Sequence, residues 1–199
     1  MMTHTTGYRG TVLSVGLVAC IAFVCFSQDH PDQPLQFIGT FSNMRYTAEH
    51  AYGEAVEVWR DGDLIVGLIS VSNGLQGDGP TGILENVRFN SHTGALSFTA
   101  KLTTMSGQEI VRGQGLTFLM SHDLFQFSGT LKATNLAGTL KHSVLSQTAS
   151  PGTPGYIPET RERVRLKIDP GTTSPFSTSS YAAWKREVDP VLKRLGPKW

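Results

Sequence analysis

Cysteine is almost missing from this chain: two of its 199 residues are cysteine, Cys20 and Cys25, and both stand in the first 27 positions. A chain cut after Ser27 would contain none. Disulfides, thiol catalysis and cysteine-ligated metal are therefore excluded as bases of the stability or function of the rest of the sequence.

The sequence also lacks an excess of charge of either sign, with 17 basic and 16 acidic side chains and a formal net charge of +1. So balanced a chain offers no strong field to a polyanion, and nucleic acid is not an expected partner. Charged residues make up 17% and apolar residues 39%. This composition predicts a folded domain, since the chain can bury enough apolar surface to offset the entropy of ordering.

A hydrophobic run long enough for a lasting membrane span is missing too. The apolar stretch from Thr11 to Phe26 has about 16 residues, whereas a spanning helix needs roughly 20. It follows a polar stretch carrying Arg9 and precedes the polar residues 27–31, an order typical of a secretory signal. We expect cleavage after Ser27 and export to the periplasm or the extracellular space.

Two other fates of this leader stay open. The sequence Leu17-Val18-Ala19-Cys20 resembles a bacterial lipobox, which would make Cys20 the lipidated N-terminus of a membrane-anchored lipoprotein. An uncleaved anchor is the third alternative. The apolar Ile21-Ala22-Phe23-Val24 that follows favours ordinary cleavage, because lipoproteins usually turn polar there. Contact with a membrane is expected through the leader or a lipidated Cys20.

From Phe37 to Val144 the sequence alternates short β-prone runs with turn signals, which predicts antiparallel hairpins. Asp61-Gly62 is the clearest turn, and residues 73–82 form a longer glycine-rich loop. The expected strands are Phe37–Tyr46, Glu54–Arg60, Leu64–Ser72, Gly82–Phe89, Ala95–Thr103, Gln108–Met120, Leu124–Lys132 and Leu136–Val144.

Glycine within these runs favours a barrel. Gly39, Gly129 and Gly138 each share the parity of flanking apolar residues, so they are expected to point inward beside side chains such as Phe37, Phe98 and Phe127. Glycine inside a strand marks a bend or a close approach, which a closed sheet needs. The predicted fold is mostly β, an antiparallel up-and-down barrel of about eight or nine strands with a C-terminal helix packed on it.

The end of the chain is expected to complete the same domain. A strand is predicted at Arg161–Ile168, followed by a helix with an apolar stripe of Tyr181, Trp184, Val188, Val191 or Leu192, and Leu195, kinked or restarted at Pro190. Its natural docking surface is Leu64–Val71, which is apolar on both faces. The predicted organisation is a signal peptide (1–27), a β-barrel domain (28–145), a Pro/Gly-rich connection (146–160) and a closing strand and helix (161–199).

Three groups of residues carry a resemblance to a known family. They are Gly39-Thr40-Phe41, then Val87-Arg88-Phe89 with Thr93 to Phe98, and Phe127 to Leu131 leading to Leu136 to Leu140. This pattern resembles the lipocalin-like, calycin-type antiparallel barrels of uncharacterised bacterial envelope proteins. The resemblance implies a barrel that holds a small ligand, and no binding residue is carried over from the family.

Motifs of known chemistry are absent from the sequence. It has no Gly-x-Ser-x-Gly, no phosphate loop and no His-Glu-x-x-His. The histidines that follow Phe37 are scattered without metal-ligand spacing: His50, His92, His122 and His142. No catalytic residue, metal or other cofactor is therefore predicted, and an enzyme is not the leading interpretation. His142 shares the inward parity of Leu140. Arg45 shares the inward parity of Phe41, and an arginine inside the barrel would pair with a ligand carboxylate.

The leading functional hypothesis is an exported, non-enzymatic β-barrel that binds a small apolar or amphipathic ligand in its interior. The expected lining is Phe41, Arg45, Phe98, Phe127, Gly129, Leu131 and His142. The alternative is a structural or protein-interaction module of the cell envelope with a solidly packed barrel. A third hypothesis is an isomerase or cyclase, which would need a histidine or carboxylate converging in the cavity. The sequence does not indicate the ligand's identity or the oligomeric state.

Overall fold

The computed structural model describes residues 34–75, 80–111, 115–174, 176, 179–197 and 199. The expected signal peptide and the alternative lipidation of Cys20 lie outside the described residues, as do residues 76–79 of the expected glycine-rich loop. Within the described ranges, no helix has the length and apolar character needed to cross a bilayer.

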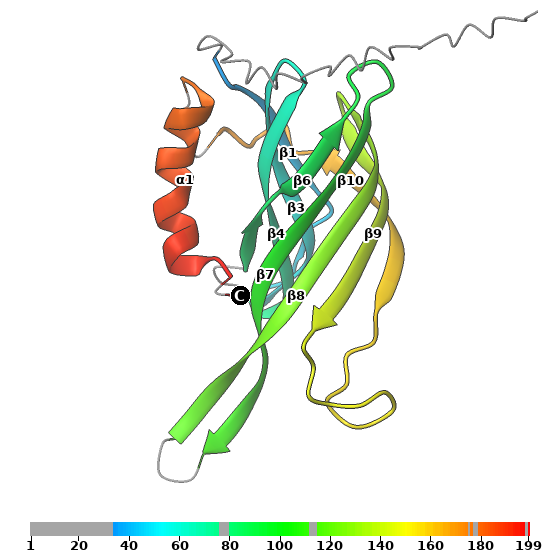
Figure 1. Ribbon diagram of the computed structural model, residues 1–199, viewed down its shortest axis with the longest axis vertical. Helices are drawn as coiled ribbons and strands as arrows, with labels where there is room; N and C mark the ends of the chain where they lie inside the picture. Colours follow the sequence, from blue (N-terminus) through cyan, green and yellow to red (C-terminus); the bar gives the residue numbers. More distant parts are fainter. Residues whose placement is uncertain (1–33, 76–79, 112–114, 175, 177–178, 198) are drawn as a thin grey trace, which may run out of the picture. The chain divides into compact units, whose positions relative to one another are not determined.

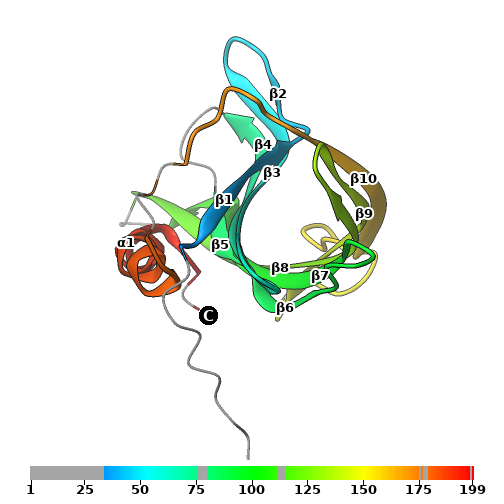
Figure 2. The ribbon, with the colours of Figure 1, turned by 90° about the horizontal axis from the view of Figure 1, so that it is seen from above.

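The strands form one antiparallel sheet that curves into a barrel (Figures 1 and 2). Neighbouring strands follow the order β5-β4-β3-β1-β10-β9-β8-β7-β6, and the two-residue β2 pairs with β3 beside this path. The predicted mostly-β antiparallel barrel is confirmed. The strands are β1 (Gln36–Ser42), β2 (Arg45–Tyr46), β3 (His50–Asp61), β4 (Leu64–Leu75), β5 (Thr81–Ile83), β6 (Glu85–Phe89), β7 (Ala95–Val111), β8 (Gly115–Lys132), β9 (Asn135–Leu145) and β10 (Thr160–Ile168).

One short segment brings the two ends of the sheet together. β5 pairs with β4 and β6 pairs with β7, while a single residue, Leu84, separates β5 from β6. The Leu84 amide donates to the carbonyl oxygen of Gly67 at 2.9 Å, and its side chain is buried. Glycine at 82 permits β5 to approach β7, because a Cβ there would collide with the carbonyl oxygen of Lys101. The barrel is thereby nearly closed.

The interior is a continuous apolar cluster with members on every long strand. Phe98 of β7 and Phe127 of β8 lie directly opposite each other and stack with their ring centres 5.1 Å apart. This arrangement is the one that alternation along these two strands predicts. The buried members are Phe41, Val56, Val58, Ile65, Ile69, Leu84, Leu96, Phe98, Ala100, Leu102, Phe125, Phe127, Leu136, Leu140, Val164 and Leu166.

A β-bulge in β1 changes which of its side chains face inward. Phe37 lies opposite Trp59, whereas the next paired residue, Gly39, lies opposite Val58 with a φ of 144°. The extra residue shifts the alternation, so Ile38 packs against the interior cluster and Phe37 packs outside, 5.1 Å from the Trp59 ring. The expectation that Phe37 shares the inner face of Gly39 is wrong for this reason.

The predicted C-terminal helix is present as α1 (Tyr181–Leu195) and packs on the outer wall of the barrel (Figure 1). Ser180 caps its N-terminus by accepting from the amide of Ala183, and the helix continues through Pro190 without a restart. The stripe Trp184, Val188 and Leu192 packs against Trp59, Val66 and Leu68 of β3 and β4. Docking on the outer face of β4 is therefore confirmed, although Tyr181 is 41% exposed.

β7 and β8 are longer than the sequence indicates and form one hairpin. Val111 lies opposite Gly115, so the expected strand Gln108–Met120 is wrong: the chain reverses in its middle. The glycine-rich sequence Arg112-Gly113-Gln114-Gly115 favours such a reversal. β8 pairs with β9 from His122 onward, and the far part of the hairpin extends beyond the barrel (Figure 1).

Candidate functional site

The barrel interior brings together most of the residues that the sequence predicts for the site. Phe41, Phe98 and Phe127 belong to the buried interior cluster, and Leu131 packs against it. The rings of Phe98 and Phe127 stack across β7 and β8. These positions make the middle of the barrel a densely apolar, aromatic region.

Gly129 and Gly138 lie directly opposite each other on β8 and β9. A Cβ on Gly129 would come within 2.6 Å of the Gly138 Cα and 2.7 Å of the Phe127 ring. The two glycines therefore let the backbones of β8 and β9 approach closely. The Phe127 ring occupies the space that side chains at these two positions would need.

A cavity of about 510 Å³ lies between the start of β1 and the end of β3, strand ends that meet at the upper end of the barrel in Figure 1. We call this end the upper mouth, and its lining residues are Pro34, Gln36, Ile38, Arg60, Asp61 and Gly62. The volume lies within the range of about 300–1,000 Å³ that ligand sites occupy. A second cavity of about 250 Å³ is bordered by Phe89, Leu96 and Gly129, among others.

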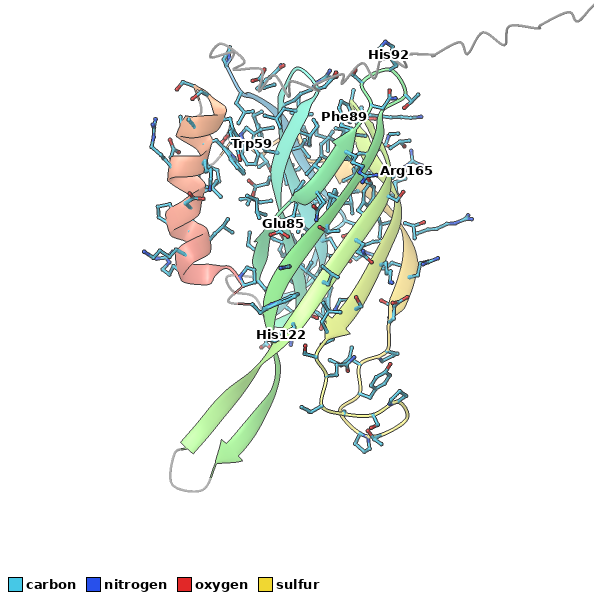
Figure 3. The ribbon with its side chains drawn as sticks, viewed as in Figure 1. Trp59, Glu85, Phe89, His92, His122 and Arg165 are labelled. Carbon is cyan, nitrogen blue, oxygen red and sulfur yellow. The ribbon has the colours of Figure 1, made fainter. Side chains whose placement is uncertain are left out.

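Arg60 is the cationic group that borders this mouth. It follows Val56 and Val58 at alternate positions of β3, and both valines belong to the interior cluster. Its guanidinium carbon lies 5.2 Å from the centre of the Phe89 ring, and its Nε donates to the carbonyl oxygen of Gly62 at 2.6 Å. The hairpin turn and the aromatic ring together hold the guanidinium at the mouth, and Figure 3 shows Phe89 near the top of β6.

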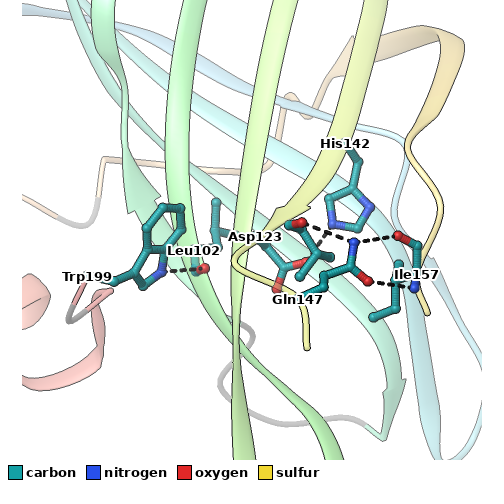
Figure 4. A network of polar contacts seen from close by, with 7 residues as sticks. Leu102, Asp123, His142, Gln147, Ile157 and Trp199 are labelled. Atoms are coloured by element: carbon teal, nitrogen blue, oxygen red, sulfur yellow. Dashed lines mark hydrogen bonds and ion pairs between the residues drawn. The ribbon is translucent and has the colours of Figure 1, made fainter. Parts of the chain in front are cut away.

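The opposite end of the interior is acidic. On β8, Asp123 shares the inner face of Phe125 and is only 4% exposed, and its Oδ1 lies 2.5 Å from Nε2 of His142 on β9 (Figure 4). The imidazole also stacks on Phe125, with ring centres 4.6 Å apart. His142 is thus fixed by a carboxylate at one nitrogen and by an aromatic ring below its face.

Glu54 adds a second carboxyl at this lower end, on the inner face of β3. Asn43 donates to its Oε2 at 2.6 Å and accepts from its backbone amide at 2.7 Å. Burial raises the pKa of Glu54 above its ordinary value; the Asn43 hydrogen bond opposes this rise and the nearby Glu162 carboxylate adds to it. The interior therefore has a cation at one end and carboxyl groups at the other.

Arg45 is not part of this interior. It is exposed and lies in β2, opposite Tyr52. β1 ends at Ser42, and the alternation that places Phe41 inside does not continue past the Asn43 contacts with Glu54. The fold places Arg60, and not Arg45, at an opening of the barrel.

Sequence reasoning missed Arg60, Asp123 and Glu54, although alternation carried a usable signal for each. Arg60 and Glu54 have the parity of Val58 and Val56, and Asp123 has that of Phe125. The partner of His142 had no such signal, because it depends on which strands become neighbours.

The described residues contain no group of three or more histidine, cysteine, aspartate or glutamate side chains arranged to hold a metal ion. No protein-family model, curated protein or solved structure matches the chain.

Proposed function

We propose that the barrel binds a small amphipathic molecule with one anionic group at its upper mouth. The observation that carries the proposal is the cavity of about 510 Å³ into which β3 directs Arg60, beside Ile38 of the bulged β1. Apolar residues (Pro34 and Ile38) and polar ones (Gln36, Arg60 and Asp61) border this cavity, and small-molecule sites combine apolar surface with a few placed polar groups in this way.

The chemistry of the rim selects the ligand. A guanidinium pairs with a carboxylate or sulfonate through two parallel hydrogen bonds, and it is only weakly hydrated. Ile38 and the Phe89 ring offer apolar surface to the rest of the molecule. Asp61 borders the same cavity, so a single negative charge is favoured over several.

The alternative function, a structural or protein-interaction module, has support from the middle of the barrel. There the Phe127 ring fills the space over Gly129 and Gly138, which is expected of a packed interior. Under this alternative the upper mouth is a surface feature without affinity for small molecules.

Export remains part of the proposal and rests on the order of polar and apolar residues before Ser27. The mature chain would begin near Gln28 and lack cysteine. Intact-mass analysis of the fractionated native protein tests this: a cytosolic chain that retains residues 1–27 would refute export, and a diacylated Cys20 would establish the lipoprotein form.

The binding proposal is tested with two fluorescent probes of similar apolar size. Anilinonaphthalene sulfonate carries one negative charge and phenylnaphthylamine carries none. Arg60→Gln should weaken sulfonate binding about tenfold or more, since a charge-assisted hydrogen bond contributes about 1.5–3 kcal/mol, and it should leave the neutral probe nearly unaffected. Arg165→Gln, an exposed arginine on β10, is the matched control. Equal sulfonate affinity in all three proteins would contradict the proposal.

A further inference from the structure

Four buried side-chain atoms in the part of the chain that the structure describes lack a hydrogen-bond partner, and they gather on one side of the molecule. They are Thr40 Oγ1, Glu57 Oε2, Trp59 Nε1 and Trp184 Nε1. Trp59 and Trp184 are completely buried and Thr40 is 7% exposed. We call this region, between the outer wall of β1 and β3 and the helix α1, the seam.

Strand register places three of these residues close together, and a ring contact adds the fourth, Trp184 of α1. Thr40 of β1 lies directly opposite Glu57 of β3. Trp59 is two residues further along β3 and therefore on the same outer face, and its ring centre lies 5.6 Å from that of Trp184. The two indoles thus lie against each other between β3 and α1, and Thr40 and Glu57 lie beside Trp59 on the outer face of the β1–β3 ladder.

Clustering of this kind indicates a shared partner. Buried polar atoms in folded proteins nearly always have a hydrogen-bond partner. The seam contains four buried polar atoms that have none. An indole N–H can only donate, and an ionised carboxylate can only accept. An anion would suit the indoles but be repelled by ionised Glu57, whereas a cation would suit Glu57 but could accept nothing from the indoles.

A hydroxyl oxygen meets both requirements, because it accepts and donates. We propose that the seam binds hydroxyl oxygens that bridge Trp59, Trp184 and Glu57, supplied by ordered water molecules or by a small polyol. Buried waters typically make about three such bonds to otherwise unpaired groups. This site is separate from the upper mouth and does not depend on the function proposed for it.

The indole signals of the protein provide a direct test. The chain contains three tryptophans, and the third, Trp199, donates from Nε1 to the carbonyl oxygen of Leu102 at 3.2 Å (Figure 4). Water-to-proton cross-relaxation is measured on all three indole N–H signals of the ¹⁵N-labelled protein. Trp59 and Trp184 should give cross-peaks with the sign of long-lived water, and Trp199, the internal control, should give none of that sign.

Two further experiments show whether water or a polyol supplies the oxygen, and whether the cross-peak at Trp184 arises from bound water or from the Thr40 hydroxyl proton. Added glycerol that shifts the Trp59 and Trp184 signals and removes their water peaks would identify a polyol as the preferred guest. Thr40→Val, which lacks an exchangeable hydroxyl, should keep the water peak at Trp184; its loss would show that the hydroxyl proton relayed the signal and would overturn the proposal. Absence of water peaks together with unchanged signals in glycerol would overturn it as well.

Discussion

Asp123 and His142 are joined by a hydrogen bond across β8 and β9 inside the barrel, with 2.5 Å between Oδ1 and Nε2. The Asp123 side chain is 6% exposed and that of His142 is 24% exposed. The carboxylate is the more deeply buried partner, so the loss of a hydrogen bond to it is expected to be costly.

Replacing His142 with alanine should therefore destabilise the protein through Asp123. We expect a loss of about 1.5–3 kcal/mol, the range for a hydrogen bond to a charged group, measured by denaturant unfolding. His92→Ala, at an exposed turn, is the control and should change little. Adding Asp123→Asn to His142→Ala should recover part of the loss. A wild-type midpoint for His142→Ala would show that the pair contributes nothing.

Glu57 should make stability depend on pH. Burial raises its pKa above the ordinary value of 4.5, so the native carboxyl holds its proton more tightly than the unfolded one. The contribution of Glu57 to stability should then be complete below pH 4.5 and should be lost as the pH rises through its native pKa.

Glu57→Gln removes this titration. The free energy of unfolding of the variant, relative to that of wild type, should therefore increase as the pH rises from 4.5 through the native pKa of Glu57. Urea unfolding of both proteins below pH 4.5 and near neutrality measures the difference, with the exposed Glu49→Gln as control. A constant difference between Glu57→Gln and wild type at all pH values would contradict this prediction.

Trp184 should be the main anchor of α1. It is completely buried, and truncation of a buried Trp commonly costs about 3–5 kcal/mol. Denaturant unfolding of Trp184→Ala measures this loss, and Tyr181→Ala, at the 41% exposed start of the same helix, should cost far less. Equal midpoints for the two variants would mean that the helix adds little to the stability of the barrel.

Gly129 should tolerate no side chain. A Cβ there would contact the Gly138 Cα at 2.6 Å and the Phe127 ring at 2.7 Å. Overpacking typically costs about 1–3 kcal/mol, so Gly129→Ala should be clearly destabilised and Gly129→Leu more so. Gly171→Ala, where the nearest atom is 3.5 Å from the added Cβ, is the control. Unchanged stability of Gly129→Ala would mean that space beside Phe127 is free.

The sequence pattern predicted the barrel and the apolar side chains in its interior. Alternation of apolar and polar residues is reliable where two strands pair without a change of register. β7 and β8 pair without a shift from Ala95 to Met105, so Phe98 and Phe127 were correctly assigned to one face. The docking of α1 on β4 was predictable from a strand that is apolar on both faces.

The errors have a common physical cause. A bulge in β1 moved Phe37 to the outside, and a reversal between Val111 and Gly115 divided an expected strand. Both depend on the partner strand and leave little trace in local sequence. The upper mouth and the pairing of Asp123 with His142 likewise required the closed sheet, which brings together segments distant in the chain.

A crystal structure of the protein with anilinonaphthalene sulfonate bound would locate the binding site directly. The sulfonate should lie within hydrogen-bond distance of the Arg60 guanidinium, with the aromatic rings against Ile38 and Phe89. A probe bound elsewhere on the molecule, or no bound probe at saturating concentration, would contradict the proposal.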